Sequence, residues 1–331
     1  MLYYYALLYY NINLKQIKTM KKIHIISTLI GLLIFSTLAK AELKVVTSIK
    51  PIHSLASYIM DGVGSPGLIV DGYNSPHSFQ LKPSHAKMLE QADIIFWIGE
   101  DLENFLEKPL DTIAKKAEKI ELLEIKNIKK LKFRERNIFE EHEGHDDHGH
   151  DAKKEEHDDH EEHGHGEYDP HIWLDPINAK IILNEITEHL IENDSKNTST
   201  YNSNLTKALA KIDKLIIDVI TETNKNLSYV VFHDAYQYYE NRFNVNILGA
   251  MTVNPDVMPG AEQIHEIHEV IEHDNVSCIL SEPQFNPDII KSIAKDTSVK
   301  TGVLDPLGAN LKPGKNLYFD LIRNMSSSFN C

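Results

Sequence analysis

The segment Tyr229–Phe243, YVVFHDAYQYYENRF, contains the pattern that decides the fold. Its first four residues are apolar and either β-branched or aromatic, which is typical of a strand buried on both faces. At His233 this run gives way to a helical pattern that continues to Phe243. Because a buried strand followed directly by a helix is the unit of parallel sheets covered by helices, the segment predicts an α/β fold.

The same alternation extends in both directions from this segment. Strands are predicted at Lys44–Ser48, Gly67–Val70, Ile94–Ile98, Tyr229–Phe232, Asn246–Leu248, Cys278–Ser281 and Lys300–Leu304. Helices are predicted at Pro51–Met60, Ser84–Ala92, Asp101–Lys108, His233–Phe243, Gly260–His273, Pro287–Lys295 and Lys315–Ser328. We therefore expect two α/β lobes, each a mainly parallel sheet flanked by helices.

One long amphipathic helix is predicted between the two halves, over residues 198–226. This stretch contains no Gly or Pro, and its apolar residues recur at steps of three and four. They are Tyr201, Leu205, Ala208, Ile212, Leu215 and Val219. We expect the helix to connect an N-terminal lobe, 42–197, to a C-terminal lobe, 227–331. An ordinary packing helix within one lobe is the alternative.

The N-terminus has the pattern of a secretory signal peptide. From Met20 the chain carries two lysines, an apolar run over residues 23–38 and an A-x-A sequence at 39–41, which are the three regions of a cleavable signal. The apolar run is short for a transmembrane anchor, which needs about 20 residues. We expect residues 1–41 to be a signal peptide with a misannotated extension before Met20. The mature protein would then begin at Glu42 in the periplasm.

The chain after this signal is strongly acidic. Residues 1–41 hold five lysines and no acidic residue, which leaves 29 of the 34 basic residues against all 49 acidic ones, a net charge of −20. This balance opposes binding to nucleic acid or anionic lipid and suits cations. No cysteine lies near the cleavage site, so no lipid anchor is expected there. Cys278 and Cys331, in an oxidising compartment, are most simply one disulfide.

Residues 140–167 interrupt the α/β pattern with a histidine-rich, acidic segment. It contains thirteen acidic residues, no aliphatic residue beyond Ala152, and eight histidines. These are His142, His145, His148, His150, His157, His160, His163 and His165. Such a segment cannot fill a core, so we expect a solvated, mobile loop. Its imidazoles and carboxylates suit borderline transition metals, which predicts auxiliary metal binding; a merely solubilising loop is the alternative.

Three histidines outside this segment lie at or just after the end of a strand or in a loop. His77 lies in SPHSFQLKPS, His171 in DPHIWLDP and His233 in VVFHDAY. In open α/β folds ligands collect beyond the carboxyl ends of the strands, where such loops converge. A single histidine in such a place is usually structural, but three together favour a binding site.

Six motifs occur in order across nearly the whole mature chain. They are SPHSFQLKPS at 75–84, DPHIWLDP at 169–176, VVFHDAYQYYENRF at 230–243, TVNPDVMPGA at 252–261, CILSEPQFNP at 278–287 and LDPLG at 304–308. This order resembles the zinc-binding solute receptors of bacterial zinc ABC transporters, within the metal-receptor group of substrate-binding proteins. The resemblance implies two lobes joined by one long helix, with the metal between them.

The resemblance also implies the ligand set and the partners. The metal histidines of the family correspond to His77, His171 and His233, and Asp305 of LDPLG corresponds to a carboxylate ligand or a group beside the metal. Some zinc receptors carry a glutamate before the first histidine, where this chain has Pro76. The fourth ligand is then Asp305 or water. The implied function is capture of Zn²⁺ as transported ligand and its delivery to an ABC transporter permease, by a protein expected to be monomeric.

Coordination chemistry supports zinc independently. Three neutral imidazoles and one oxygen form a tetrahedral site that suits Zn²⁺, whereas Mn²⁺ prefers more carboxylates. Manganese receptors of the same group carry a carboxylate at the place of His233, so a manganese or iron receptor is the alternative. A secreted zinc hydrolase is the less favoured one, because the chain contains neither H-E-x-x-H nor G-x-S-x-G. The protein is not expected to be an enzyme.

The remaining histidines have weaker interpretations. His265 and His268 are expected to be a solvent-facing pair on a helix, with a weak secondary metal site as the alternative. His85 begins a helix and His189 lies late in one, where a capping or surface role is the ordinary expectation. His53 follows the first strand and is a minor candidate for the cleft. Glu282 ends a strand, where it would support a metal ligand.

Overall fold

The computed structural model describes Met20 and residues 42–134, 138, 166–253, 255, 259–297 and 299–331. The predicted signal peptide, apart from Met20, and residues 140–165 of the histidine-rich segment lie outside this description. Within it, no helix is both long and apolar enough to cross a membrane. The chain divides into two units, Met1–Glu42 and Leu43–Cys331, and every element named below belongs to the second.

The first sheet is built from four parallel strands in the order β2-β1-β3-β4. Its strands are β1 (Val45–Ile49), β2 (Gly67–Val70), β3 (Ile94–Trp97) and β4 (Glu118–Glu121). All residues of β1 and β3 are buried, as expected for central strands covered on both faces. Its connecting helices are α2 (Lys50–Ile59), α3 (Pro83–Glu90) and α4 (Glu100–Thr112).

The second sheet repeats this arrangement in the order β6-β5-β7-β8, again with parallel neighbours. Its strands are β5 (Ser228–His233), β6 (Asn246–Thr252), β7 (Cys278–Ser281) and β8 (Lys300–Val303). The helices between them are α7 (Gln237–Phe243), α8 (Ala261–His273) and α9 (Asp288–Asp296). The two parallel sheets confirm the predicted two-lobed α/β architecture.

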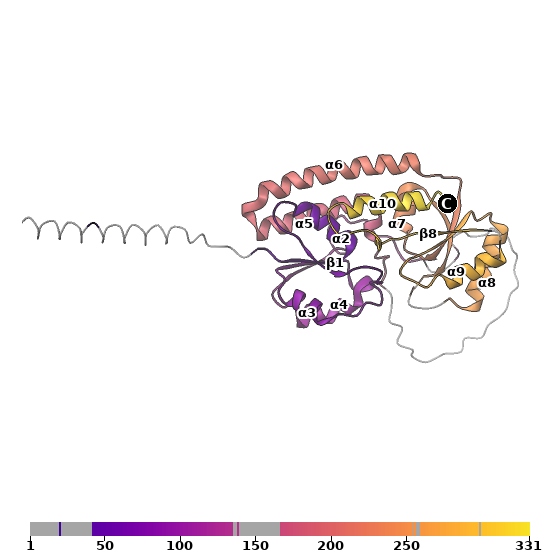
Figure 1. Ribbon diagram of the computed structural model, residues 1–331, viewed down its shortest axis with the longest axis horizontal. Coiled ribbons are helices and arrows are strands. Elements are labelled where there is room, and N and C mark those ends of the chain that lie inside the picture. The colour runs from indigo at the N-terminus through magenta and orange to yellow at the C-terminus, as the bar shows by residue number, and fades with distance from the viewer. Residues whose placement is uncertain are drawn as a thin grey trace, which may run out of the picture. The chain divides into compact units, whose positions relative to one another are not determined.

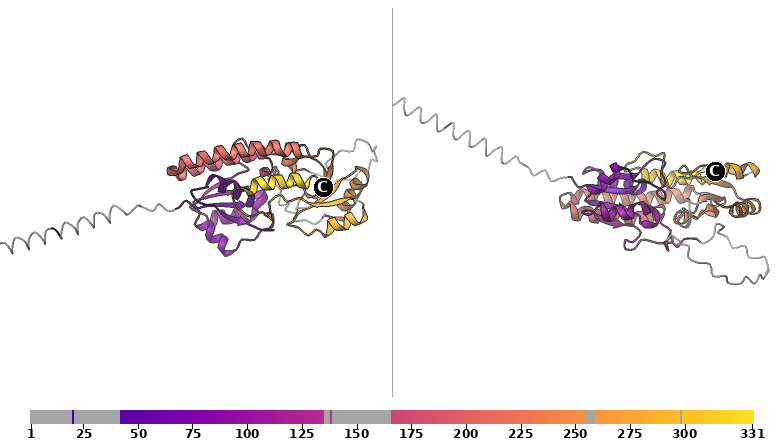
Figure 2. Two further views of the ribbon diagram at one scale, coloured as in Figure 1. Left: turned by 45° about the horizontal axis from the view of Figure 1, so that its top comes forward. Right: turned by 90° about the horizontal axis from the view of Figure 1, so that it is seen from below.

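The long helix α6 (Thr198–Glu222) is also confirmed, and it ends four residues earlier than the pattern suggests. Tyr201, Ala208, Ile212, Leu215 and Val219 are buried on one side of it. This side packs on α2, on α5 (Pro176–Asn193) and on the C-terminal helix α10 (Leu317–Ser328). Figures 1 and 2 show α6 running alongside α10 and leading from α5 toward the second sheet.

The C-terminal segment crosses back to the first lobe. Helix α10 packs on α2, and Lys50 at the start of α2 donates from Nζ to the carbonyl oxygens of Ala309, at 3.0 Å, and Leu311, at 2.7 Å. The chain end returns to the second sheet, where Cys331 forms a disulfide with Cys278 of β7. The C-terminal segment therefore contacts both lobes.

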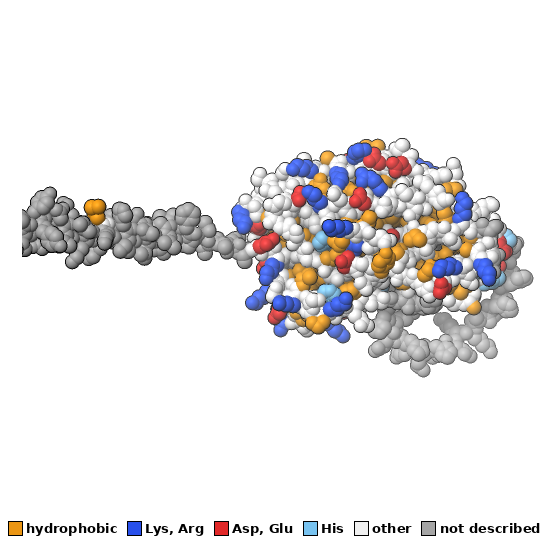
Figure 3. Space-filling view, viewed as in Figure 1, with side chains coloured by type: hydrophobic (Ala, Val, Ile, Leu, Met, Phe, Trp, Pro, Cys, Tyr) orange, Lys and Arg blue, Asp and Glu red, His pale blue; other side chains and the backbone are white. Residues whose placement is uncertain are grey.

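On the face seen in Figure 3, positive and negative side chains are interspersed.

Two elements were not predicted from the sequence. Strand β4 reads EKIE, and Ile120 is its one buried residue, so it lacks the apolar run that identifies the central strands. Helix α5 has a clear start signal, because Asp175 accepts a hydrogen bond from the Ile177 backbone and Pro176 occupies the first turn.

Helix α7 was predicted, but it begins at Gln237 rather than His233, because His233 still pairs with Thr252 as part of β5.

Candidate metal centre

The three candidate histidines come from three separate places in the fold. His77 lies in the loop after β2, His171 precedes the 3-10 turn η1 (Ile172–Leu174), and His233 is the last residue of β5. Ser75 accepts a hydrogen bond from the His77 backbone N–H at 3.2 Å, which shapes the loop that presents this side chain. The positions of His77 and His233 agree with the rule that binding sites form at the carboxyl ends of parallel strands, whereas His171 comes from the segment before η1.

The structure brings these three imidazoles together. Each offers one ring nitrogen, and the three nitrogens lie within 4.8 Å of one another. The Nε2 atoms of His171 and His233 are 3.4 Å apart, and the ring centroids of His77 lie 5.5 and 5.7 Å from those of His171 and His233. His171 and His233 are only 4% and 3% exposed, whereas His77 is half-buried. Two deep ligands and one nearer the surface suit an ion that enters and leaves.

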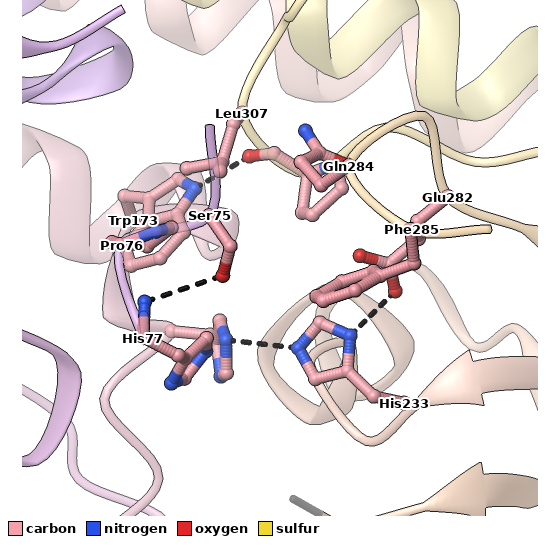
Figure 4. Close-up of a pocket in the computed structure, with 11 residues that line it drawn as sticks. Ser75, Pro76, His77, Trp173, His233, Glu282, Gln284, Phe285 and Leu307 are labelled. Atoms are coloured by element: carbon pink, nitrogen blue, oxygen red, sulfur yellow. Dashed lines mark hydrogen bonds and ion pairs between the residues drawn. The ribbon is translucent and has the colours of Figure 1, made fainter. Parts of the chain in front are cut away.

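A carboxylate holds each of the two buried imidazoles from behind. Nδ1 of His171 donates to Oδ1 of Asp169 at 2.6 Å, and Nδ1 of His233 donates to Oε1 of Glu282 at 2.6 Å. Because a carboxylate oxygen accepts, it favours the tautomer with the hydrogen on Nδ1, which leaves the lone pair of a neutral ring on Nε2. Such carboxylate–histidine pairs fix the tautomer and raise the basicity of a metal ligand. The arrangement therefore directs the Nε2 atoms of both rings toward one location. Figure 4 shows His233 with its Nδ1 bonded to Glu282.

The electrostatics of the two rings differ. Burial, together with the nearby His233, lowers the pKa of His171 well below its usual value. Burial also opposes protonation of His233, but the carboxylates of Glu282, Asp234 and Asp169 together outweigh burial and raise the pKa of His233. Burial raises the pKa of Asp169 to about 7, against the hydrogen bond from the His171 backbone. A divalent cation bound by the imidazoles would offset the negative charge of the buried carboxylates beside them.

The pocket around the histidines has mostly apolar walls. Trp173, Phe285, Pro306 and Leu307 line it together with Ser75, Pro76, Gln284 and Glu282 (Figure 4). These residues come from both lobes, and no lysine or arginine is among them. Trp173 Nε1 donates to the Pro306 carbonyl oxygen at 2.9 Å, which joins the two sides of the pocket. A cation entering here meets no fixed positive charge on the walls.

Two residues of helix α7 donate hydrogen bonds to Asp169. Gln237 Nε2 donates to Oδ2 of Asp169 at 3.2 Å, and the Tyr238 hydroxyl donates to the Asp169 carbonyl oxygen at 2.8 Å. Nearby, Arg242 forms a two-point ion pair with Asp175 at 2.7 and 2.8 Å. These bonds join α7 of the second lobe to the segment that carries His171. Asp169 was not predicted from the sequence, although its position two residues before a candidate ligand was a usable signal.

Asp305 does not join the histidine nitrogens. Its Oδ1 accepts hydrogen bonds from Gln284 Nε2 at 3.0 Å and from the backbone N–H groups of Leu307 and Gly308 at 3.1 and 2.9 Å. Its Oδ2 accepts from the Ala309 backbone at 2.6 Å. In the structure this carboxylate therefore stabilises the turn over residues 306–309. Two residues of this turn, Pro306 and Leu307, line the pocket.

The other histidines singled out in the sequence lie away from this group. His53 is buried in α2 with Nε2 3.2 Å from the Pro66 carbonyl oxygen, and His85 accepts from the Lys82 backbone at the start of α3. His265 is exposed and His268 is half-buried on α8, and within the described ranges they do not belong to a metal-competent group. The eight histidines of 140–167 lie outside the described residues.

Comparison with known proteins agrees with this geometry. The family model described as "ZnuA: Zinc-uptake complex component A periplasmic" matches residues 45–330. The chain is 43% identical over 312 residues to "High-affinity zinc uptake system protein ZnuA" of Brucella abortus (strain 2308), covering 88% of this chain and 92% of the relative. It is 35% identical over 303 residues to the protein of the same name from Yersinia pestis, covering 90% and 94%.

Solved structures show the same fold. A crystal structure of ZnuA aligns with a TM-score of 0.68 at 20% identity, covering 87% of this chain and 99% of that one. A mutant of the laminin-binding adhesin of Streptococcus agalactiae aligns with a TM-score of 0.70 at 22% identity, covering 87% and 98%. The family match extends over nearly all of the two-lobed unit and includes the three clustered histidines. The chain belongs to the family of periplasmic zinc-uptake complex component A.

Proposed function

We propose that this protein captures Zn²⁺ with high affinity and delivers it to the membrane permease of a zinc ABC uptake transporter. The observation that carries the proposal is the convergence of three imidazole nitrogens, two of them backed by carboxylates at 2.6 Å, in a pocket between the lobes. Relatives at 43% and 35% identity are named high-affinity zinc uptake proteins, which supports the same cargo here.

The ligand set favours zinc over harder cations. His77, His171 and His233 supply three nitrogens, and we assign the fourth position to water, because both oxygens of Asp305 already accept hydrogen bonds. Three imidazoles and one oxygen match the tetrahedral preference of Zn²⁺. Mn²⁺ and Ca²⁺ prefer more oxygen ligands. Asp169 and Glu282 balance the charge of the ion without coordinating it.

The location and partners follow from the same proposal. Residues 1–41 act as a cleaved secretory signal, and the mature monomer works in the periplasm beside the permease. The histidine-rich segment 140–167 binds further zinc ions and raises their concentration near the pocket. The mature chain has a net charge of −20 after residue 41, and this negative charge attracts cations to the protein.

The pocket is proposed to bind rather than to catalyse. A hydrolytic zinc needs a general base beside its bound water. Asp169 and Glu282 each face an imidazole Nδ1 and are committed to holding a ligand. The relatives are named as uptake proteins, and the pocket chemistry agrees with storage and release of an ion.

A competition titration of zinc against a chromophoric chelator tests the proposal. Wild-type protein is expected to bind one Zn²⁺ tightly, and His171→Ala is expected to lose the tight site because a buried ligand is missing. His268→Ala, a histidine of α8 outside any metal group of the described residues, is the matched control and is expected to bind as wild type does. Unchanged tight binding in His171→Ala would show that the assigned pocket is not the zinc site.

A further inference from the structure

A second group of potential metal ligands lies on the first lobe, on α5 and β4. Glu118, His189 and Glu192 each offer one ligand atom, and these atoms lie within 4.8 Å of one another. The sequence pattern gave His189 only an ordinary surface role. Its neighbours from two elements give it a different environment from that of the other surface histidines.

The ring of His189 is surrounded by carboxylates. Its Nδ1 lies 2.8 Å from Oε1 of Glu118, and its Nε2 lies 3.3 Å from Oε1 of Glu185, one turn earlier in α5. Glu192 is three residues later, and residues three and four apart share a helix face. Because Glu118 begins β4, the group joins a helix to a sheet rather than lying on a single helix surface.

The ring is also held in place by its surroundings. The His189 side chain is only 19% exposed, and its ring packs edge-on against the buried Phe96 of β3, with centroids 6.2 Å apart. Asn193 Nδ2 donates to Oε2 of Glu118 at 2.9 Å and orients that carboxylate. A fixed imidazole and an oriented carboxylate reduce the ordering that an ion would have to impose.

The charge of the group is unbalanced. Glu118, Glu185 and Glu192 surround a single imidazole, and among the described residues no lysine or arginine lies within ion-pair distance of any of them. Like charges at such distances repel one another, and a cation bound among them removes the repulsion. One imidazole with carboxylates is a ligand set for borderline transition metals rather than for Mg²⁺ or Ca²⁺.

We propose that Glu118, His189 and Glu192 form a second site for a divalent transition-metal ion of the Zn²⁺ class. Three protein ligands leave the remaining coordination positions to water, and the exposed Glu192 side chain must become ordered on binding. The second site is therefore weaker than the pocket between the lobes. This inference does not depend on the proposed zinc capture by His77, His171 and His233.

The competing explanation is a purely structural one, in which His189 bridges Glu118 and Glu185 and connects α5 to β4. The chain contains a matched comparison. His265 and Glu269 on α8 form the same histidine–glutamate pair four residues apart, with Nε2 and Oε1 at 3.6 Å. Within the described part of the chain, no metal-competent group includes His265. It therefore serves as an internal control for non-specific effects of zinc.

The test is the rate of acylation of individual histidines by diethylpyrocarbonate in the full chain, read by mass spectrometry. The reagent attacks a neutral ring nitrogen, so a bound metal protects it. Zinc is added beyond the amount that fills the tight pocket. With zinc about tenfold above the dissociation constant, the rate at His189 is expected to fall about tenfold. The rate at His265 is expected to stay the same.

The double variant Glu118→Gln/Glu192→Gln completes the test. It keeps the size of both side chains but removes two charged ligands, so His189 is expected to lose its protection while tight zinc binding in the pocket is retained. A His189 rate that zinc does not change in the wild type, whether fast or slow, overturns the proposal. Full protection in the double variant also overturns it.

Discussion

Glu282 and His233 occupy equivalent positions at the carboxyl ends of two neighbouring parallel strands, His233 as the last residue of β5 and Glu282 directly after β7. Val231 of β5 pairs with Leu280 of β7, so His233 and Glu282 each lie two residues beyond this pair and emerge on the same side of the sheet. Their side chains meet with Oε1 2.6 Å from Nδ1. The register of the sheet thus places a candidate metal ligand and the carboxylate that orients it side by side.

Glu282→Gln tests the contribution of this carboxylate. The amide keeps the size and one acceptor oxygen but removes the charge that makes His233 more basic, so zinc affinity is expected to fall about 10–100-fold. The measurement is a competition titration with a chelator. Glu272→Gln, an exposed glutamate of α8, is the control. Equal affinities of wild type and Glu282→Gln would show that the carboxylate does not act on the ligand.

Asp305→Ala separates a structural role from coordination. The carboxylate accepts three backbone N–H bonds and one from Gln284, so its loss is expected to lower the free energy of unfolding by about 1–3 kcal/mol. Zinc affinity is expected to fall less than that of His171→Ala, because water fills the fourth position. Chemical denaturation and the chelator titration measure the two effects. A loss of affinity equal to that of His171→Ala would make Asp305 a ligand.

The sequence predicted the sheets well because each central strand is an apolar run between helical patterns. Edge strand β4 escaped prediction, since it buries only Ile120 and its pairing with β3 comes from tertiary contacts. The return of α10 to the first lobe was not predicted for the same reason. Local periodicity identifies a helix, but it does not say which sheet the helix covers.

In the candidate site too, features set by local sequence were predicted and features set by long-range contacts were not. The clustering of His77, His171 and His233 was predictable from their positions at a strand end or in a loop and from the motifs around them. The partners of these residues were harder to predict: Glu282 was only a suggestion, and Asp169 was missed. Asp169 depends on contacts with α7, which lies about 70 residues away in sequence, as in the bond from Gln237. Sequence patterns therefore identified the three histidines that cluster in the structure, but not the carboxylates that orient two of them.

Glu103 gives the metal-free protein a pH-dependent stability. It is buried in α4, where burial raises its pKa to about 7 although it accepts bonds from the Ile98 and Gly99 backbones at 2.8 and 3.1 Å. A raised pKa means that the folded state favours the protonated form. The stabilising contribution is thus complete below the unfolded pKa of 4.5 and is lost as pH rises through about 7.

Glu103→Gln removes this titration and keeps an acceptor for the backbone bonds. The free energy of unfolding of the wild type, relative to the variant, is expected to fall by up to about 3 kcal/mol between about pH 5 and about pH 8. Urea denaturation with a chelator present measures it. Glu107→Gln, an exposed residue of the same helix, is the control. A constant difference between wild type and Glu103→Gln across this range would contradict the assignment.

The last prediction distinguishes the histidine-rich segment from the pocket. Residues 132–134 and 166–168 meet in a short stem, through a bridge between Lys132 and Tyr168 and a bond from the Phe133 N–H to the Glu167 carbonyl. Deletion of residues 140–165 spares this stem, and it is expected to remove several weak zinc sites while leaving the tight one. Imidazoles in a polar segment titrate near pH 6.5, so the weak sites are expected to fade on mild acidification. The pocket has the higher affinity and should hold zinc to lower pH, because metal and protons compete for the same nitrogens.

Calorimetric titration of both forms at about pH 7.5 and about pH 5.5 measures this difference, since the second value lies below the imidazole pKa. A full-length variant with the eight histidines of the segment changed to asparagine is the matched control, because it keeps the segment's length and acidic residues. If that variant loses the weak sites as the deletion does, the imidazoles are their ligands. If the weak sites persist, the carboxylates hold them. Loss of the tight site in either form would make the segment part of the pocket, contrary to the geometry of His77, His171 and His233.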